Sequence, residues 1–416
     1  MEFQELDSLV IENPHEHGIR KHEYKSLTLF CADSPPKTEI EKKTRGTIFQ
    51  GDECLLRSMP FCKEIIVDEN AYHNITNALS ENSSHDALHH VLYRAIEGTI
   101  IRLIHVKSEG QWYITTHKKL NAYQSKWGNE KSFGDLFELA IQHTTKKTLN
   151  EFFKCLNTDY QYTFLLTTTK KTRLVCSTPE SIIETGIPQI FLYVVTSNSG
   201  TLYIDPITSS ITIGIPLQPE LVLSDSPLVE RSSETSRDQL ANAIIKYVKS
   251  VDPLTSQGIL LLDIRTLQSI KFVNQDYFDL FQIRGGHIPS IPFAYLNIIS
   301  DADKVKKFKQ ICYPDELEIL SKYDKIISDI CNDIKKLYIQ RYVEKDISMR
   351  TDTIKHNILK KIREQRVNIN NMYNAIYILV MQLPPTSINK LIKQILIDEK
   401  RNVAMKLNEF IAIKIE

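Results

Sequence analysis

Charged side chains flank two apolar segments in the first third of the chain. Glu97-Gly98 opens the apolar run Gly98–Val106, and the basic segment Thr116-His117-Lys118-Lys119 follows a second run, Gln111–Thr116. Lysine and arginine side chains neutralise phosphate charge, so the basic segment suits contact with phosphate or RNA. Arg45 and Lys271 add two further cations beside predicted strands.

A β-hairpin must position the charged groups around residue 100. The runs 98–106 and 111–116 are joined by a turn at Lys107–Gly110, whose Glu-Gly step marks the reversal. A helical pattern follows from Phe133 to Ile141. Further strands are predicted at 45–49, 162–166, 173–176, 190–196, 201–204, 211–213, 257–263 and 269–273, and helices at 71–80, 85–94, 236–251 and 276–281.

The pattern changes at about residue 286, beyond a turn-rich joint, Gly286–Pro292. The remaining chain is helical in pattern, with helices predicted at 302–311, 314–342, 353–365, 372–383 and 387–410. This part contains 22 Lys and Arg against 16 Asp and Glu, a modest basic bias that solvated helix faces also explain. We therefore predict an α+β domain over 1–285 and an all-α domain over 286–416.

Composition excludes several classes of protein. The 416 residues are 42% hydrophobic and 25% charged with zero formal net charge, so no global field draws the chain to nucleic acid or a membrane. The seven cysteines include no Cys-x-x-Cys pair, which argues against a zinc site or a disulfide framework and favours a reducing compartment. The first residues lack the apolar core of a signal peptide, and no apolar run is long enough to span a bilayer. We expect a soluble, intracellular protein.

The ordered segments resemble the motifs of the covalent nucleotidyltransferases, which comprise RNA ligases, DNA ligases and capping enzymes. In that family a Lys-x-Asp/Asn-Gly motif supplies the lysine amine that attacks the α-phosphate of ATP or GTP, and Glu97-Gly98 resembles its second half. The other resembling segments follow in the family's order: Arg45-Gly46, Thr116–Lys119, Lys171–Val175, Gln257–Leu260, and Ser269–Lys271 with Tyr277. The likeness is closest to the bacteriophage RNA ligase 1 branch and to RNA-ligase-1-like proteins of large DNA viruses. It implies a ligase adenylation-domain-like fold of antiparallel sheets with helices, followed by the all-α domain.

The groups that perform nucleotidyl transfer in the family are missing. The lysine position holds Ala95, whose methyl group cannot form a covalent bond to a nucleotide. A carboxylate position holds Gln257, a poorer ligand for a hard cation, and a lysine position holds Ser269. The carboxylate of the middle motif falls near Leu165 or Leu166. No catalytic or metal-binding residue is therefore expected, and the Cβ of Ala95 should face the cleft between the strands that carry Glu97, Gln257 and Lys271.

The resemblance and these losses together indicate a pseudo-ligase that binds RNA or acts as a scaffold in viral RNA processing or transcription. The expected nucleotide- or RNA-binding residues are Arg45, Glu97, Gly98, Lys118, Lys119 and Lys271. No cofactor is certain; ATP and Mg²⁺ are implied only for a working ligase. Protein partners are expected to bind through the helical domain, and no membrane partner is expected. The protein is expected in the cytoplasm of an infected cell or packaged in a virion. Two alternatives stay open: an active RNA ligase with a displaced nucleophile, for which Lys118 is the nearest lysine, and a structural or interaction protein with no role in nucleic-acid binding.

Overall fold

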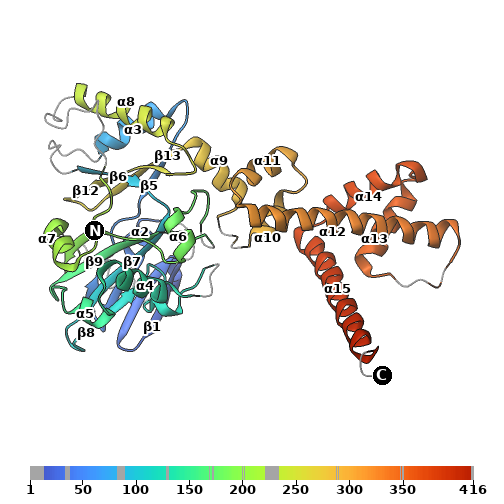
Figure 1. Cartoon of the computed structure of the whole chain (residues 1–416). Helices are drawn as coiled ribbons and strands as arrows, with labels where there is room; N and C mark the ends of the chain where they lie inside the picture. Colours follow the sequence, from blue (N-terminus) through green and yellow to red (C-terminus); the bar gives the residue numbers. More distant parts are fainter. Residues whose placement is uncertain are drawn as a thin grey trace. The chain divides into compact units, whose positions relative to one another are not determined.

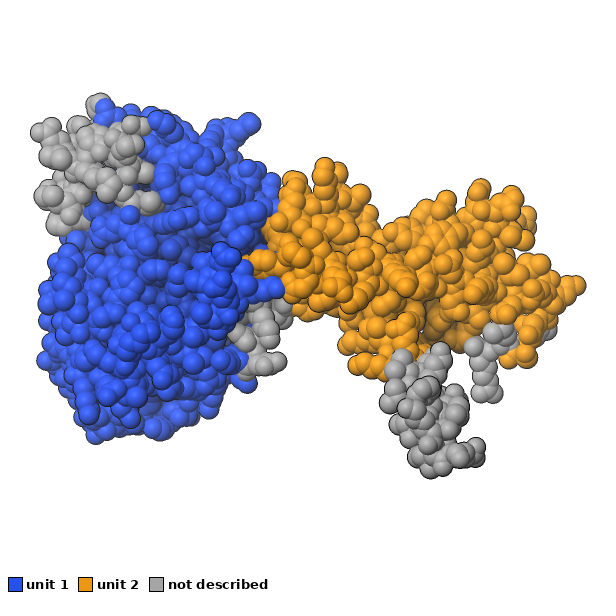
Figure 2. Space-filling view, in the orientation of Figure 1, with its two compact units in different colours: residues 1–281 blue, residues 282–416 orange. Residues whose placement is uncertain are grey.

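The structure is a computed structural model of the 416-residue chain. It describes residues 14–32, 38–81, 90–127, 131–167, 169–170, 173–198, 200, 202–220, 234–286, 288, 290–346, 348 and 351–413. The chain divides into two compact units, Met1–Phe281 and Gln282–Glu416, which are coloured separately in Figure 2. The first unit mixes sheets with helices, and the second is helical (Figure 1).

The first unit contains three sheets. The N-terminal sheet is antiparallel in the order β1-β2-β3-β4, with strands Ile19–Tyr24, Leu27–Ala32, Thr47–Gln50 and Glu53–Leu56. The central sheet is antiparallel in the order β11-β10-β9-β7-β8, with strands Tyr203–Ile204, Ile190–Ser197, Tyr160–Thr167, Gly98–Val106 and Gln111–Thr115. The third sheet has the order β5-β13-β12-β6, with strands Lys63–Val67, Ser269–Asn274, Gly258–Asp263 and His90–Ala95; only its β5–β13 pair is parallel.

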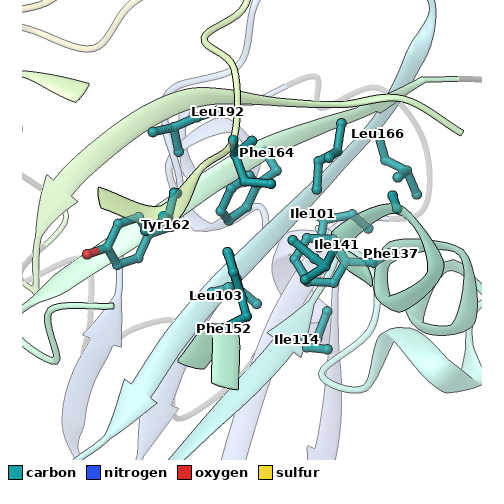
Figure 3. Packing of buried hydrophobic residues seen from close by; sticks show 14 of the residues in the cluster. Ile101, Leu103, Ile114, Phe137, Ile141, Phe152, Tyr162, Phe164, Leu166 and Leu192 are labelled. Atoms are coloured by element: carbon teal, nitrogen blue, oxygen red, sulfur yellow. The ribbon is translucent and has the colours of Figure 1, made fainter. Parts of the chain in front are cut away.

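The hairpin predicted from two apolar runs joined by a Glu-Gly turn is confirmed as β7 and β8. Its register pairs Val106 with Gln111 across the turn, where Gly110 adopts a φ of 63° that favours glycine. One face of this hairpin packs on the N-terminal sheet through a cluster that includes Leu29, Ile48 and Ile104. The other face contributes Ile101 and Leu103 to a core cluster that includes Phe137, Phe152 and Phe164 (Figure 3).

Helices cover the sheets and complete the cores. α4, Phe133–Thr145, begins at a capping box of Ser132 and Asp135 and buries Phe137 and Ile141 against the central sheet (Figure 3). α3, Ala71–Glu81, and α8, Glu234–Ser250, pack on the third sheet. The other α-helices of this unit are α2, Glu39–Thr44, α5, Leu149–Phe153, α6, Glu180–Thr185, α7, Pro206–Ile213, and α9, Gln275–Arg284, which runs past residue 281.

Three predictions of local structure are wrong. The helix predicted over 85–94 is a strand from His90, because pairing with β12 outweighs a helical pattern that is short and ambiguous. The strand predicted over 211–213 is the end of α7, which Asp205 caps and Pro206 starts. Residues 173–176 form no strand, since their backbone N–H groups bind a buried carboxylate instead of a neighbouring strand.

The second unit is a set of α-helices around one apolar core. The helices are α10, Ile291–Ile298, α11, Ala302–Gln310, α12, Pro314–Tyr338, α13, Thr353–Glu364, α14, Met372–Met381, and α15, Pro385–Ile413. A π-helical turn, Ile339–Val343, continues α12. α12 buries an apolar stripe that includes Ile327 and Ile330 in this core, beside Leu359 and Ile376. Within the described part of the chain, no helix combines the length and hydropathy that a bilayer span requires.

Candidate functional site

A cavity of about 330 Å³ lies in the first unit, between strands of the central and third sheets. Apolar side chains line part of its wall, among them Leu56, Met59, Phe61, Ile100, Tyr193 and Leu260. The charged lining consists of three arginines, one lysine and one glutamate: Arg45, Arg57, Arg102, Lys271 and Glu64. Among the described residues, this wall therefore carries an excess of positive charge and suits an anionic ligand with an apolar part.

Most of the predicted motif positions meet at this cavity. Arg45, from the end of α2, and Ala95, from the end of β6, line it together with Gln257, Ser269 and Lys271. Backbone pairing aligns two of these segments, since the N–H of Gln257 donates to the carbonyl of Ala95 at 2.9 Å. The methyl group of Ala95 thus lies in the same wall as Gln257 and Lys271, with no amine at that position.

The only lysine in the described lining is Lys271, and it is already paired. Its Nζ lies 2.7 Å from Oε1 of Glu64, the single carboxylate of the lining. Because the two charges of this ion pair cancel, the pair adds no net charge to the cavity lining. The remaining charge comes from arginines, which keep their protons and cannot act as nucleophiles at neutral pH.

The carboxylate of Glu97 does not line the cavity. Glu97 is 2% exposed, and its oxygens accept hydrogen bonds from the backbone N–H groups of Leu174, Val175 and Cys176 at 2.8–3.2 Å. The Tyr277 hydroxyl donates a fourth bond at 2.8 Å, and burial, followed by the charge of Glu97, raises the pKa of that hydroxyl. The buried carboxylate of Glu97 therefore holds the segment 173–176 in place through hydrogen bonds. The sequence analysis predicted instead that Glu97 contacts a nucleotide or RNA.

Gly98 and the lysine pair also have local roles. Gly98 lines the cavity, and a Cβ there would lie 2.6 Å from the Leu166 carbonyl, so the close approach of β7 and β9 requires glycine. Lys118 and Lys119 are exposed in the turn after β8, where their N–H groups donate to Thr116 Oγ1 at 3.2 and 3.0 Å. Neither lysine lines the cavity, although His117 between them and the strand does.

Arg102 is the main feature of the cavity that the sequence analysis missed. It lies within β7, is 3% exposed, and donates through Nη1 to the Gly46 carbonyl at 2.6 Å and to Ser58 Oγ, and through Nη2 to the Thr116 carbonyl at 2.7 Å. Its Nε has no partner, and no carboxylate among the described residues pairs with it. Burial and then the neighbouring Arg45 lower the pKa of Arg102 to about 9, so it remains charged at neutral pH.

Arg45 and His117 stand beside this buried guanidinium. The Arg45 guanidinium lies over the Phe61 ring, 5.2 Å from its centroid, and burial lowers its pKa. Burial, Arg102 and Arg45, in that order, hold the pKa of His117 well below its ordinary value, so its imidazole is neutral at pH 7. Gly46, with a φ of 79°, fits between them, because a Cβ there would lie 3.1 Å from both Arg102 Nη1 and His117 Cδ2.

The residues of this cavity do not fit a catalytic divalent metal ion. Hard cations such as Mg²⁺ require several oxygen ligands, usually carboxylates. Glu64 is committed to Lys271, the oxygens of Glu97 are occupied by four donors, and Gln257 offers a neutral amide. The described residues contain no group of three or more His, Cys, Asp or Glu that could hold a metal ion.

Comparison with known proteins identifies the family. No family model matches the chain. The chain is 35% identical over 421 residues to the immediate-early protein ICP-46 homolog of Invertebrate iridescent virus 6, covering 94% of this chain and 86% of that protein. It is 34% identical over 220 residues to the ICP-46 homolog of Invertebrate iridescent virus 3, covering 52% of this chain and 42% of that protein. The chain belongs to the immediate-early protein ICP-46 family of iridescent viruses.

Solved structures similar to this one include ligases. An archaeal ATP-dependent RNA ligase aligns at a TM-score of 0.41 with 10% identity, covering 90% of this chain and 78% of that chain. A putative ATP-dependent DNA ligase from Aquifex aeolicus aligns at 0.42 with 11% identity, covering 90% and 79%. TM-scores below 0.5 at this identity do not establish a shared activity.

Proposed function

We propose that this protein is a degenerate, RNA-ligase-like factor whose cavity binds the phosphate groups of RNA without forming a covalent bond to them. One observation carries the proposal: Arg45, Ala95, Gln257, Ser269 and Lys271, which are widely separated in the sequence, line a single cavity. Their order along the chain resembles that of ligase motifs. Cations are retained in this set, whereas the attacking amine and the metal-binding carboxylate are not.

The chemistry of the lining supports binding over bond formation. A lysine nucleophile needs an amine that is free to attack, whereas the Lys271 Nζ lies 2.7 Å from Oε1 of Glu64 in an ion pair. Ala95 offers no reactive atom, and the Lys118 side chain lies outside the described lining. The runner-up function, an active RNA ligase with a displaced nucleophile, therefore has no suitably placed amine in the cavity. ATP, which also carries phosphate groups, remains a candidate ligand that would bind without transfer of its nucleotide to the protein.

The helical unit is proposed to extend the binding surface for RNA or a protein partner. Arg341, in the π-helical turn, and Arg363, in α13, place their guanidinium carbons 5.7 and 5.0 Å from the centroid of the Tyr342 ring. Arginine and tyrosine side chains together provide stacking surfaces for single-stranded bases. Deleting 286–416 tests this role: a truncated protein that remains folded should bind RNA less tightly. The immediate-early designation of the iridescent-virus relatives supports a setting early in infection.

RNA binding is tested by titrating labelled single-stranded RNA at several salt concentrations. Counterion release at about three phosphate contacts predicts a slope of roughly −2 in log affinity against log salt. Arg45→Glu should weaken binding at least tenfold because it reverses a lining charge. Lys107→Glu is the matched control, since Lys107 is exposed and paired with Asp159 away from the cavity.

The same titration separates the remaining alternatives. Affinity that depends on neither salt nor Arg45 would favour a structural or interaction protein with no role in nucleic-acid binding. Salt-dependent affinity that is lost with Lys118→Glu and Lys119→Glu, but kept with Arg45→Glu, would place the RNA on the exposed turn and contradict the cavity proposal.

A further inference from the structure

Arg102 has an electrostatic environment that is incomplete without a ligand. A buried cation is normally paired with a carboxylate, because removing a charge from water costs several kcal/mol. Three hydrogen bonds to neutral acceptors hold Arg102 in place, yet no carboxylate among the described residues balances its charge. Because Arg102 lines the cavity, an anion inside the cavity would supply the missing charge.

Two uncompensated guanidinium groups face the same space. Arg45 lines the cavity near Arg102, and its side chain has no hydrogen bond or ion pair with the described residues apart from the contact with Phe61. Their proximity is repulsive, since the charge of Arg45 disfavours the charged form of Arg102. A phosphodiester carries one negative charge, whereas a terminal phosphate carries between 1.5 and 2 near pH 7, a general property of phosphate monoesters. A dianion therefore matches the two arginines better.

His117 adds a group that can respond to the ligand. It lines the cavity, and the hydrogen bonds among the described residues include none to its ring nitrogens. The charged groups that face it are Arg102, from β7, and Arg45, from the end of α2, and both disfavour an imidazolium. A bound dianion would reverse this field, so the imidazole would take up a proton and donate a charge-assisted hydrogen bond.

We propose that Arg45, Arg102 and His117 form a metal-independent site for a dianionic phosphate monoester, the terminal phosphate of an RNA or of a mononucleotide. This assignment rests on the proposed function, because it defines which phosphate the cavity binds. Arginines supply the positive charge that a divalent cation would otherwise supply, and Ser58, already bonded to Arg102, adds a hydroxyl at the same wall. The terminal phosphate would therefore anchor the ligand.

Calorimetric titration with matched ligands tests the site. The probes are a short 5′-phosphorylated RNA, the same RNA with a 5′-hydroxyl, AMP and adenosine, all in EDTA at pH 7.5. The phosphorylated member of each pair should bind at least tenfold more tightly. Arg102→Met and Arg45→Met should each abolish that preference, and Arg265→Met, at an exposed position outside the lining, should preserve it. Titration in two buffers of different ionisation enthalpy should reveal proton uptake that is absent in His117→Gln.

The outcomes distinguish this site from RNA binding in general. Equal, salt-dependent affinity for both RNAs would overturn the monoester site while leaving RNA binding intact. A preference for AMP over adenosine without affinity for either RNA would support the site and overturn the RNA function. Binding that requires Mg²⁺ would contradict metal independence. If Arg102→Met fails to fold, Arg45→Met and His117→Gln still decide the result.

Discussion

Glu97 and Arg102 lie five positions apart and are both almost fully buried, at 2% and 3% exposure, but their surroundings differ. Four donors surround the Glu97 carboxylate, and none of its contacts faces the cavity lining. Arg102 contacts neutral acceptors on one side and the cavity on the other. A buried charge whose partners are all internal stabilises the fold, whereas one that lacks a counter-charge beside a cavity indicates a ligand. The following predictions test this distinction.

The largest effect is expected on removing the Glu97 carboxylate. Glu97→Ala leaves three backbone N–H groups of residues 174–176 and the Tyr277 hydroxyl without their acceptor, so the free energy of unfolding should fall by about 3 kcal/mol or more. Urea denaturation measures the change. A loss below about 1 kcal/mol would show that this carboxylate does not organise the segment, and would reopen a ligand-binding role.

A smaller effect is expected from His117 as the pH falls. Its pKa is lowered in the folded state, so below about pH 6.5 the unfolded chain binds a proton that the folded chain does not. Stability is therefore lost on acidification, by about 1 kcal/mol between pH 7 and 5.5. His117→Gln should remove that part of the pH dependence, and His143→Gln, at an exposed position, should not. Identical pH profiles for the wild type and His117→Gln would contradict a half-buried imidazole that stays neutral.

The smallest effect on stability is expected at Arg102. Arg102→Met fills similar space and removes an unpaired buried charge, which offsets the loss of hydrogen bonds to two carbonyls and Ser58. The free energy of unfolding should change by less than about 1 kcal/mol, while affinity for phosphate is lost. A loss as large as that of Glu97→Ala, with phosphate affinity unchanged, would make Arg102 a structural residue and remove the contrast between the two sites.

Local signals predicted much of the fold correctly. The β7–β8 hairpin follows from two apolar runs on either side of a Glu-Gly turn, and α3, α4 and the helices of the second unit follow from apolar periodicity and capping residues. The errors occur where tertiary contacts decide. Residues 90–94 form a strand because β12 supplies a pairing partner, and residues 173–176 are irregular because Glu97, distant in sequence, binds their N–H groups.

The site was predictable only in part. Motif order indicated that Arg45, Ala95, Gln257 and Lys271 belong together, and they line one cavity. A single signal pointed to Arg102, namely a charged residue inside the apolar run of β7, but its unbalanced charge depends on Gly46, Ser58 and Thr116, which come from other segments. Sequence patterns likewise could not show that the Glu97 carboxylate is used internally, because its backbone donors lie 77–79 residues away and its fourth donor, Tyr277, lies 180 residues away.

The central claim is that the cavity binds phosphate without covalent transfer. Incubating the purified protein with α-labelled ATP or GTP and Mg²⁺, with an active RNA ligase as the positive control, tests it most directly. We predict no labelled protein band after denaturation, because Ala95 has no amine and Lys271 is paired with Glu64. An acid-labile, base-stable labelled band would contradict the claim, and mapping the label to Lys118 or Lys271 would identify the displaced nucleophile of an active ligase.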